Sequence, residues 1–379
     1  MSIWKILHSS LLCTGTAVGA GFIALPMFVV NLGIPMSIGL IFLMCFVAYK
    51  SSMMLVDLNC VNRVPASIVG LTKKYTGNAC FLATLFSFYL FSFGVLTVYF
   101  SCFSDTLTVM SSINPNVIGI GFACALFILL SLHIDKMSRI NSLLVLVSLI
   151  MLSLAVFFLQ STPESRTQTI SMNWKELGMF FPICLTSFVM QGVCPQICSY
   201  LNYNRRHIQI ALIIGLLIPM GVYITWITGV LNAVSTHDSD FFVQMQQHQV
   251  TVGQLIDCLC KTSGSLFGVI LKWVTLCAVV TSAIGFAVCV VQAMRAIVPL
   301  PVARIIPCIV PVAVNWLIPN AFVCVLCFSG LMAMIFTILS PYLCLKRKKL
   351  PCYFSYYLCV VIALVVGVCE IVNLLHDFL

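Results

Sequence analysis

The sequence predicts an all-α integral membrane protein that crosses a bilayer eleven times, and three observations support this prediction. Of the 379 residues, 61% are apolar and only 8% are charged, whereas about a quarter of the residues in an ordinary soluble domain are charged. The apolar residues form continuous runs rather than alternating with polar ones, which favours helices over a β-barrel. Two of these runs are interrupted near the middle by glycine and proline.

The same composition excludes a soluble domain and a disordered chain. The formal net charge of +9 does not indicate nucleic-acid binding, because the few charges are spread over a very apolar chain. In membrane proteins such a basic excess reports the orientation of the loops. We therefore expect a single transmembrane domain that covers residues 1–379.

The crossings follow from the length of the apolar runs, because a helix needs about 20 apolar residues to span the hydrocarbon core. Nine runs of this length contain no Asp, Glu, Lys or Arg. The two longest, 6–49 and 305–345, are each long enough for two crossings. Each contains a turn signal, Asn31-Leu32-Gly33-Ile34-Pro35 in one and Ile318-Pro319-Asn320 in the other. Seven single crossings and two hairpins give eleven; the single crossings lie in 75–104, 106–134, 140–163, 177–204, 207–237, 273–294 and 350–369.

Loop charges predict the orientation of the chain. An odd number of crossings places the termini on opposite sides of the membrane. With the N-terminus inside, fourteen of the 19 Lys and Arg residues lie in cytoplasmic segments, and only Arg166, Lys175 and Lys261 lie outside. The positive-inside rule therefore favours a cytoplasmic N-terminus and an outer C-terminus.

Two further features argue against extra-membrane structure. The first run is too long for a cleaved signal peptide and leads directly into a second crossing. The longest polar loop, 233–264, is outside and has room for only a short helix.

Most of the 20 cysteines lie within apolar runs, where a reduced thiol packs as a small apolar group. Cys258 and Cys260 lie in the outer loop, and their pairing is left open.

The first crossing contains a stretch that is poor in helix-forming residues. It reads Gly15-Thr16-Ala17-Val18-Gly19-Ala20-Gly21 and is followed by Pro26. Small residues of this kind allow close packing between membrane helices. Alternatively, the helix opens here, which is tolerated only where the freed backbone faces protein or a polar cavity.

The sixth crossing contains a similar stretch, Val189-Met190-Gln191-Gly192-Val193-Cys194-Pro195. If the chain consists of two five-helix halves, approximately 1–160 and 177–345, the first and sixth crossings occupy corresponding positions and run in opposite directions. Paired Gly/Pro interruptions of this kind are typical of transporters built from inverted repeats. The segment 350–375 would then be an additional helix.

The chemistry of the predicted site comes from helix ends. The N-terminus of a half-helix binds a carboxylate, and its C-terminus presents carbonyl groups to an ammonium group or a cation. No Asp, Glu, Lys or Arg lies near the middle of any crossing, so a zwitterion of zero net charge is the best match. A membrane enzyme would need clustered acids, histidines or metal ligands in the bilayer, and a channel would need a symmetric pore. We predict neither, and we predict no cofactor.

These residues also carry a family resemblance. The Gly15–Gly21 motif with Ala24-Leu25-Pro26 resembles the first helix of the bacterial aromatic amino-acid permeases, the tyrosine- and tryptophan-specific group. The stretch from Phe181-Pro182 through Thr186-Ser187-Phe188 to Pro195, and the stretch from Ile218-Pro219 to Trp226, are also similar. The likeness covers nearly the whole chain. Gln191 departs from it, because the family often has a histidine there.

The resemblance implies the five-plus-five inverted-repeat fold and proton-driven import of aromatic amino acids, tyrosine above all, across a bacterial inner membrane. The periplasm would then be the outer side. The expected partners are the amino acid, a coupling ion and membrane lipid. The alternative is a sodium-coupled symporter of another neutral amino acid, such as tryptophan, serine or threonine. The sequence predicts no oligomeric state.

The resemblance also implies the residues of the site. The substrate backbone would lie at the two interruptions, beside an aromatic side chain of the third crossing, although Tyr89 and Phe93 equally suit packing against lipid or core. The implied substrate residues are Thr16, Val18, Gly19, Ala20, Gly21, Met190, Gln191, Gly192, Tyr89 and Phe93.

The coupling ion is less well defined by the residues. Sodium would need oxygen ligands, and Thr281 and Ser282 offer adjacent hydroxyls. Similarity to related sodium transporters implies that such a pair would lie against the carbonyls of Gly15 and Val18. Those hydroxyls alternatively bond their own helix. His133 beside Asp135 suits either a proton relay or a solvated loop. The resemblance favours the proton, and no other metal is expected.

Overall fold

The computed structural model describes residues 3–18, 21–132, 134–159, 174–247, 249–295, 298–318 and 322–378. Every regular element of these residues is a helix. The elements of the first half are α1 (Ile3–Ala17), α2 (Gly21–Val29), α3 (Ile34–Asn62), α4 (Ile68–Tyr75), α5 (Asn78–Ser111), α6 (Pro115–Ser131) and α7 (Ile134–Leu159).

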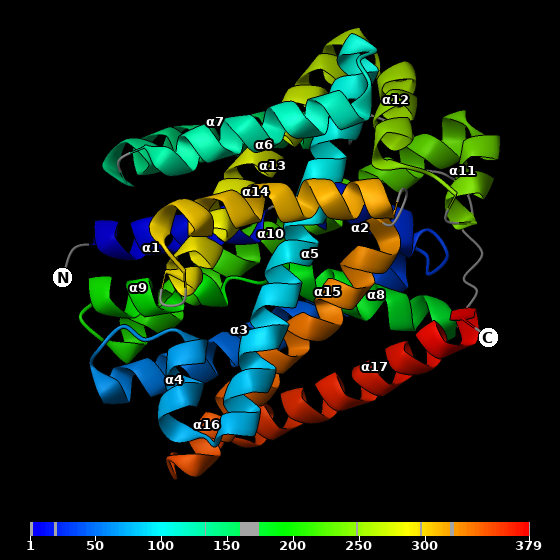
Figure 1. Ribbon diagram of the computed structural model, residues 1–379. Helices are drawn as coiled ribbons and strands as arrows, with labels where there is room; N and C mark the ends of the chain where they lie inside the picture. The colour runs from blue at the N-terminus through cyan, green and yellow to red at the C-terminus, as the bar shows by residue number, and fades with distance from the viewer. Residues whose placement is uncertain are drawn as a thin grey trace.

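The regular elements of the second half, from residue 174 onward, are also helices. Its elements are α8 (Trp174–Ser187), the 3₁₀ turn η1 (Gln191–Val193), α9 (Cys194–Tyr200), α10 (Arg205–His237), α11 (Ser239–Gln246), α12 (Val252–Ser263), α13 (Ser265–Met294), α14 (Leu300–Leu317), α15 (Phe322–Met334), the π-helical turn η2 (Ile335–Leu339), α16 (Ser340–Arg347) and α17 (Phe354–Phe378). Figure 1 shows α1 beginning near the N-terminus at one end of the molecule and α17 ending at the opposite end.

Seven helical segments of the described chain are long and apolar enough to cross a membrane. The segments are Ile34–Asn62, Asn78–Ser111, Glu176–Tyr200, Arg205–His237, Leu266–Met294, Leu300–Leu317 and Val325–Arg347. Pro115–Ser131, Leu143–Leu159 and Phe354–Glu370 are shorter apolar helices, and α1 and α2 share the first apolar run. The chain is therefore a multi-pass membrane protein, while the count of eleven crossings stays a prediction.

Helix boundaries follow local signals. The first hairpin turns at Gly33, which has a φ of 73°, and Pro35 then stands in the first turn of α3. At the second hairpin α14 ends at Leu317. Pro319 and Asn320, which form the predicted turn signal, lie outside the described residues. The third crossing is longer than its uncharged run, because α5 continues past Asp105 to Ser111.

The polar loop 233–264 differs from expectation, because it holds two short helices, α11 and α12, rather than one. The Asp238 side chain accepts a hydrogen bond from Phe241 N at 2.9 Å and begins α11. Thr251 and Gln254 form a capping box that begins α12. One face of α12 is buried, with Val252, Leu255, Ile256 and Leu259 at helical spacing. The described cysteines, including Cys258 and Cys260, form no disulfide in the structure.

The helices pack in a recurring set of pairs. α1 packs along α10, and α3 packs against α8 and α9. α5 packs along α15, and α7 packs along α13. The centre of the bundle brings α2 against α8 and α5 against α13. These contacts place the interruption between α1 and α2 next to the interruption that follows α8.

Candidate functional site

The chain is interrupted at both of the predicted positions. The last hydrogen bond of α1 runs from Val18 N to Thr14 O at 2.8 Å, and α2 begins at Gly21. Gly19 and Ala20 lie outside the described residues. α8 ends at Ser187, and regular structure resumes with η1 at Gln191. Each interruption frees backbone groups that an unbroken helix would have paired.

The two interruptions touch each other through Gly21. A Cβ atom on Gly21 would lie 2.2 Å from Ser187 Oγ and 3.1 Å from Ser187 Cα. A side chain of any size is therefore excluded, because the obstacle includes the backbone of α8. Gly192 is different, since a Cβ there would lie 3.8 Å from Cys289 Sγ, an ordinary contact. Among the described contacts, Gly21 leaves no room for a side chain, whereas Gly192 does.

Tyr223 of α10 joins the two interruptions. Its Oη lies 2.8 Å from the carbonyl oxygen of Ala17 and 2.8 Å from that of Ser187. These carbonyls belong to the last residues of α1 and α8. The hydroxyl carries one proton, so the two carbonyls share a single donor. The side chain is fully buried, and this donor is placed where the end of each half-helix concentrates partial negative charge.

Aromatic rings enclose this contact. Phe188 packs edge-on against Tyr223 with ring centroids 5.2 Å apart. One turn further along α10, Trp226 packs edge-on against Phe22 of α2 at 5.4 Å. One face of α10 therefore covers both interruptions. Sequence reasoning missed Tyr223; its spacing of three from Trp226 signals a shared helix face, but no sequence pattern identifies the carbonyls it reaches.

The site contains no charged side chain of its own. Neither Thr14–Pro26 nor Phe180–Pro195 includes an Asp, Glu, Lys or Arg. Polar recognition here depends on backbone N–H and C=O groups and on hydroxyls. The N-terminus of α2 suits a carboxylate, and the C-terminal ends of α1 and α8, whose last carbonyls share the single proton of Tyr223, suit an ammonium group.

Several predicted substrate residues already have partners within the protein. Thr16 Oγ1 donates to Leu12 O at 2.6 Å in its own helix. Gln191 is buried; its Nε2 donates to Ser51 Oγ of α3 at 2.7 Å, and its Oε1 accepts from Met190 N at 3.0 Å. The amide group of Gln191 therefore bonds to the protein itself at the second interruption, on one side to α3 and on the other to the backbone of Met190. Val18 is buried at the end of α1.

The predicted aromatic pair lies on α5. Tyr89 and Phe93 are half-buried, and their rings stack with centroids 6.2 Å apart. Among the described residues, Tyr89 Oη is buried without a hydrogen-bond partner. The ring contacts found for this pair stay within α5 and connect neither ring to an interruption. Phe91 and Tyr99 of the same helix instead meet Phe286 of α13.

The predicted ion residues come from helices that contact each other, α1 and α13. Thr281 Oγ1 donates to Ala278 O at 2.9 Å, so it bonds its own helix. Ser282 Oγ is buried without a partner in the described part of the chain. Gly15 faces α7, since a Cβ there would lie 2.9 Å from Val145 Cγ1. His133 lies outside the described residues.

Comparison with known proteins gives a consistent set of relatives. A family model described as the tryptophan/tyrosine permease family matches residues 3–375. A glutamine transporter of Aliivibrio fischeri, "Glutamine transporter 2", is 24% identical over 352 residues, which are 89% of this chain and 88% of that protein. "Tyrosine-specific transport system 1" of Haemophilus influenzae is 22% identical over 360 residues, 89% of this chain and 86% of the relative. A tryptophan-specific transport protein of Pseudomonas aeruginosa is 23% identical over 370 residues, 91% and 87% of the two chains.

The close approach at Gly21 predicts a sharp difference between two glycines. Gly21→Ala should lower the free energy of unfolding by roughly 1–3 kcal/mol or more, because the backbone of α8 must move. Gly192→Ala should leave it nearly unchanged. Apparent melting temperatures of the two variants in the same detergent test this, and equal values would contradict the contact between Gly21 and Ser187.

The shared donor at Tyr223 predicts a second difference. Tyr223→Phe should cost about 1–3 kcal/mol, because two buried carbonyls lose their only observed side-chain donor. Tyr89→Phe is the matched control, since it removes a buried hydroxyl that has no partner, and it should be neutral or slightly stabilising. Thermal unfolding of both variants in detergent measures the difference. A Tyr223→Phe variant as stable as Tyr89→Phe would show that the hydroxyl does not hold the interruptions.

Proposed function

We propose that this chain, which belongs to the tryptophan/tyrosine permease family, is a secondary active transporter that imports aromatic amino acids, with tyrosine as its main substrate. The observation that carries the proposal is the meeting of two interrupted helices in a region with no charged side chain. A site built from backbone groups suits a zwitterion, whose two charges cancel. The relatives named for tyrosine and tryptophan transport support the aromatic preference.

In this proposal the amino and carboxyl groups of the substrate lie at the two interruptions. Gly19, Ala20 and Gly21 lead into α2, whose N-terminus attracts the carboxylate. The carbonyls that end α1 and α8 attract the ammonium group. Tyr89 and Phe93 are the candidates to contact the aromatic ring of the substrate. The Tyr89 hydroxyl has no hydrogen-bond partner among the described residues, so it is available to donate to the side chain of the substrate.

We also propose eleven crossings, arranged as two inverted repeats of five, approximately 1–160 and 177–345, with 350–375 as an additional helix. The packing pairs support this arrangement. If each helix of the first half corresponds to one of the second, the pair α5 and α15 is equivalent to the pair α13 and α7. The pair α1 and α10 is likewise equivalent to α8 and α9 against α3.

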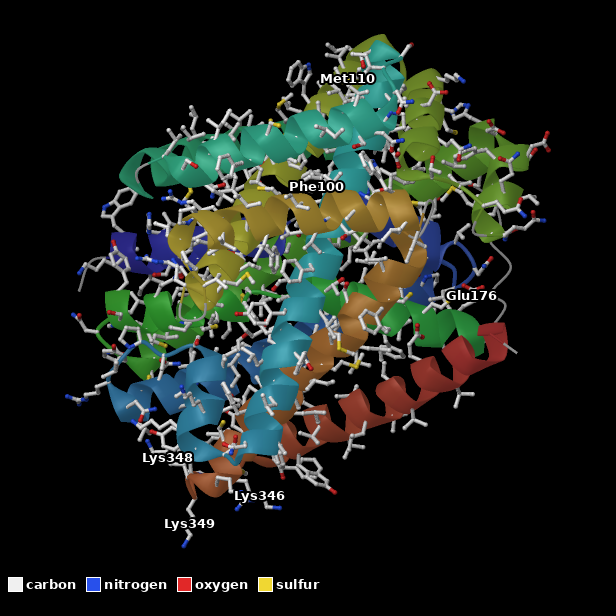
Figure 2. The ribbon with its side chains drawn as sticks, viewed as in Figure 1. Phe100, Met110, Glu176, Lys346, Lys348 and Lys349 are labelled. Atoms are coloured by element: carbon white, nitrogen blue, oxygen red, sulfur yellow. The ribbon has the colours of Figure 1, made fainter. Side chains whose placement is uncertain are left out.

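The orientation that we propose places the N-terminus in the cytoplasm and the C-terminus in the periplasm of a bacterial inner membrane. Lys346, Lys348 and Lys349 gather at one end of the molecule, whereas Glu176 lies near the other end, where α17 finishes (Figure 2). This polarity agrees with the positive-inside rule. A C-terminal reporter should be active only on the periplasmic side, and cytoplasmic activity would contradict the eleven-crossing arrangement.

For the coupling ion we propose the proton. The resemblance of the two interruptions to the aromatic permeases supports this choice. The bond that Thr281 donates to its own helix leaves the lone pairs of its oxygen available, so it does not distinguish the proton from sodium. The alternative is sodium-coupled transport of another neutral amino acid, tryptophan, serine or threonine. A specific observation keeps it as a second candidate, since one relative is named as a glutamine transporter.

Uptake into proteoliposomes tests substrate and ion together. An inside-alkaline pH gradient should accumulate labelled tyrosine, with unlabelled tryptophan and phenylalanine competing better than glutamine, serine or threonine. A sodium gradient alone should not drive uptake. Equal competition by glutamine or serine would contradict the aromatic assignment while leaving the transporter class intact.

The double variant Thr281→Ala/Ser282→Ala separates the two ions. Under proton coupling it should keep the ion dependence of the parent. The matched control is Thr275→Ala, because Thr275 makes the same bond to its own helix, with Oγ1 2.9 Å from Leu271 O. Uptake that follows sodium in the parent and weakens in the double variant, but not in Thr275→Ala, would overturn the proton.

A further inference from the structure

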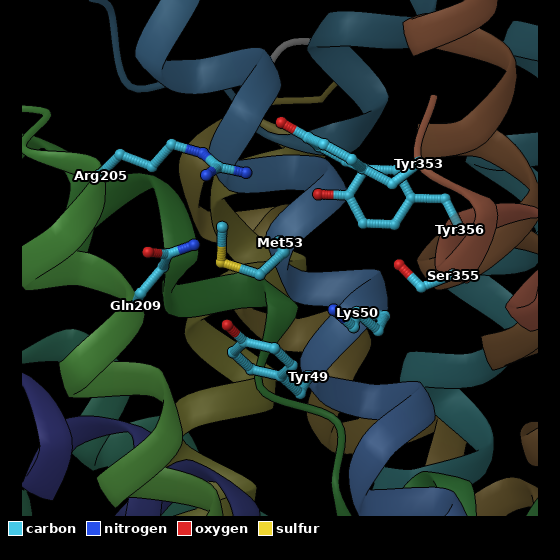
Figure 3. A pocket seen from close by; sticks show the side chains of 8 residues that line it. All are labelled: Tyr49, Lys50, Met53, Arg205, Gln209, Tyr353, Ser355 and Tyr356. Atoms are coloured by element: carbon cyan, nitrogen blue, oxygen red, sulfur yellow. The ribbon is translucent and has the colours of Figure 1, made fainter. Parts of the chain in front are cut away.

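A polar pocket lies at the end of the molecule where α10 and α17 begin, and none of the residues that line it belongs to the interruptions. Its volume is about 240 Å³, and three helices supply its walls (Figure 3). Tyr49 and Lys50 come from α3, Arg205 and Gln209 from α10, and Tyr353 and Ser355 from the beginning of α17. The walls therefore combine two cations with hydroxyl and amide groups.

Arg205 is held in place by a carboxylate beneath the pocket. Its Nε lies 2.6 Å from Asp57 Oδ1, and its Nη2 lies 3.2 Å from Asp57 Oδ2. Tyr356 Oη donates to the same carboxylate at 2.7 Å. A guanidinium has five N–H groups, and this pair uses two of them. The remaining donors of Arg205 stay on a fixed side chain at the pocket wall.

Lys50 leaves the pocket with a net positive charge. Among the described residues it forms no ion pair, and its Nζ lies over the rings of Tyr49 and Phe46 at 5.3 and 5.5 Å from their centroids. Because Asp57 balances Arg205, the ammonium group of Lys50 is uncompensated. A zwitterion of zero net charge gains little from such a site, whereas an anion gains both the charge and the surrounding donors.

The beginning of α17 indicates the depth of the pocket in the membrane. Phe354, Tyr357 and Tyr353 are 81%, 56% and 49% exposed. Exposed aromatic side chains at a helix end are typical of the membrane–water interface. Further along α17, Leu364, Val365 and Val368 are exposed apolar residues that suit contact with lipid chains. The pocket therefore lies at the level of the lipid headgroups.

We propose that this pocket binds the phosphate group of an anionic membrane lipid, with Lys50 and Arg205 as its cationic ligands. Basic pockets between membrane helices are suited to such headgroups. The volume accommodates a headgroup and leaves the acyl chains against the exposed apolar face of α17. Ser355 and Gln209 supply hydrogen bonds to the phosphate oxygens. The residue after Lys50, Ser51, accepts the bond from Gln191, so the same turn of α3 borders both this pocket and the second interruption.

Lipid titration followed by native mass spectrometry of the full chain in detergent tests the proposal. The parent should bind short-chain phosphatidylglycerol more tightly than phosphatidylcholine, and inorganic phosphate only weakly. Lys50→Met should weaken phosphatidylglycerol binding about five- to tenfold, because one interfacial cation is lost. Lys50→Arg should retain binding. The matched control is Lys346→Met, which removes an exposed lysine at the same end of the molecule.

Three outcomes would overturn the proposal. The first is equal binding of phosphatidylglycerol and phosphatidylcholine by the parent, and the second is a loss of affinity in Lys346→Met as large as that in Lys50→Met. Inorganic phosphate that binds as tightly as the lipid would indicate a site for a free anion instead. If Lys50→Met does not fold, Ser355→Ala carries the test, since it removes a half-buried hydroxyl of the pocket wall. Unchanged phosphatidylglycerol affinity in Ser355→Ala would then count against the pocket.

Discussion

The hydrogen-bonding demand of the backbone is the constraint on which this structure depends. In hydrocarbon there is no water to pair with an exposed N–H or C=O group, and each unpaired group costs several kcal/mol. Two of the crossings are nevertheless interrupted. The interruptions persist because the protein supplies replacement partners: the Tyr223 hydroxyl serves the carbonyls of Ala17 and Ser187, and the Gln191 side chain accepts from Met190 N.

The same demand explains why α10 and α3 pack so closely against the broken helices. α10 brings Tyr223 to both interruptions, and α3 brings Ser51 to Gln191. Apolar packing alone gives little specificity between helices in lipid, because the lipid chains are as apolar as the side chains. Polar contacts and close backbone approach therefore determine the arrangement. At Gly330 of α15 a Cβ would lie 2.3 Å from Pro182 Cβ and 2.5 Å from Pro182 O, so this helix also rests directly on the backbone of α8.

Charged side chains and opened backbone lie in different parts of the molecule. The interruptions contain opened backbone and no charged side chains, whereas the ends of the molecule carry the ionised groups. The pair of Arg205 and Asp57 lies where α10 begins, and the lysines of α16 lie at the end shown in Figure 2. This separation is consistent with both of our proposals, an uncharged site for a zwitterion in the membrane interior and a cationic pocket for a lipid phosphate at the interface. Each environment suits its ligand because the cost of burying a charge falls steeply toward water.

The sequence by itself determined that the chain is a helical membrane protein, and it identified where two helices are interrupted. Those properties depend on local composition: long uncharged runs cannot be stable in water, and three glycines between Gly15 and Gly21 lower the helix propensity of the first crossing, although the structure keeps Gly15 in α1 and Pro26 in α2. The resemblance at the same residues pointed to the family that the comparison then showed. The loop 233–264 was only partly predicted, because the caps at Asp238 and Thr251 create two helices where its length indicated room for one.

Only the tertiary structure decided which groups meet at the interruptions. Tyr223 was not predicted, because its partners are 206 and 36 residues away in the chain. The substrate contact of Gln191 stays a prediction, and what the structure adds is that its side chain bonds Ser51, 140 residues away. The role of Tyr89 and Phe93 beside the substrate ring also stays a prediction, and the structure adds that their contacts with other aromatic rings stay within α5. Long-range contacts of this kind depend on how the helices pack, and packing in lipid follows from shape and polar complementarity that no local pattern records.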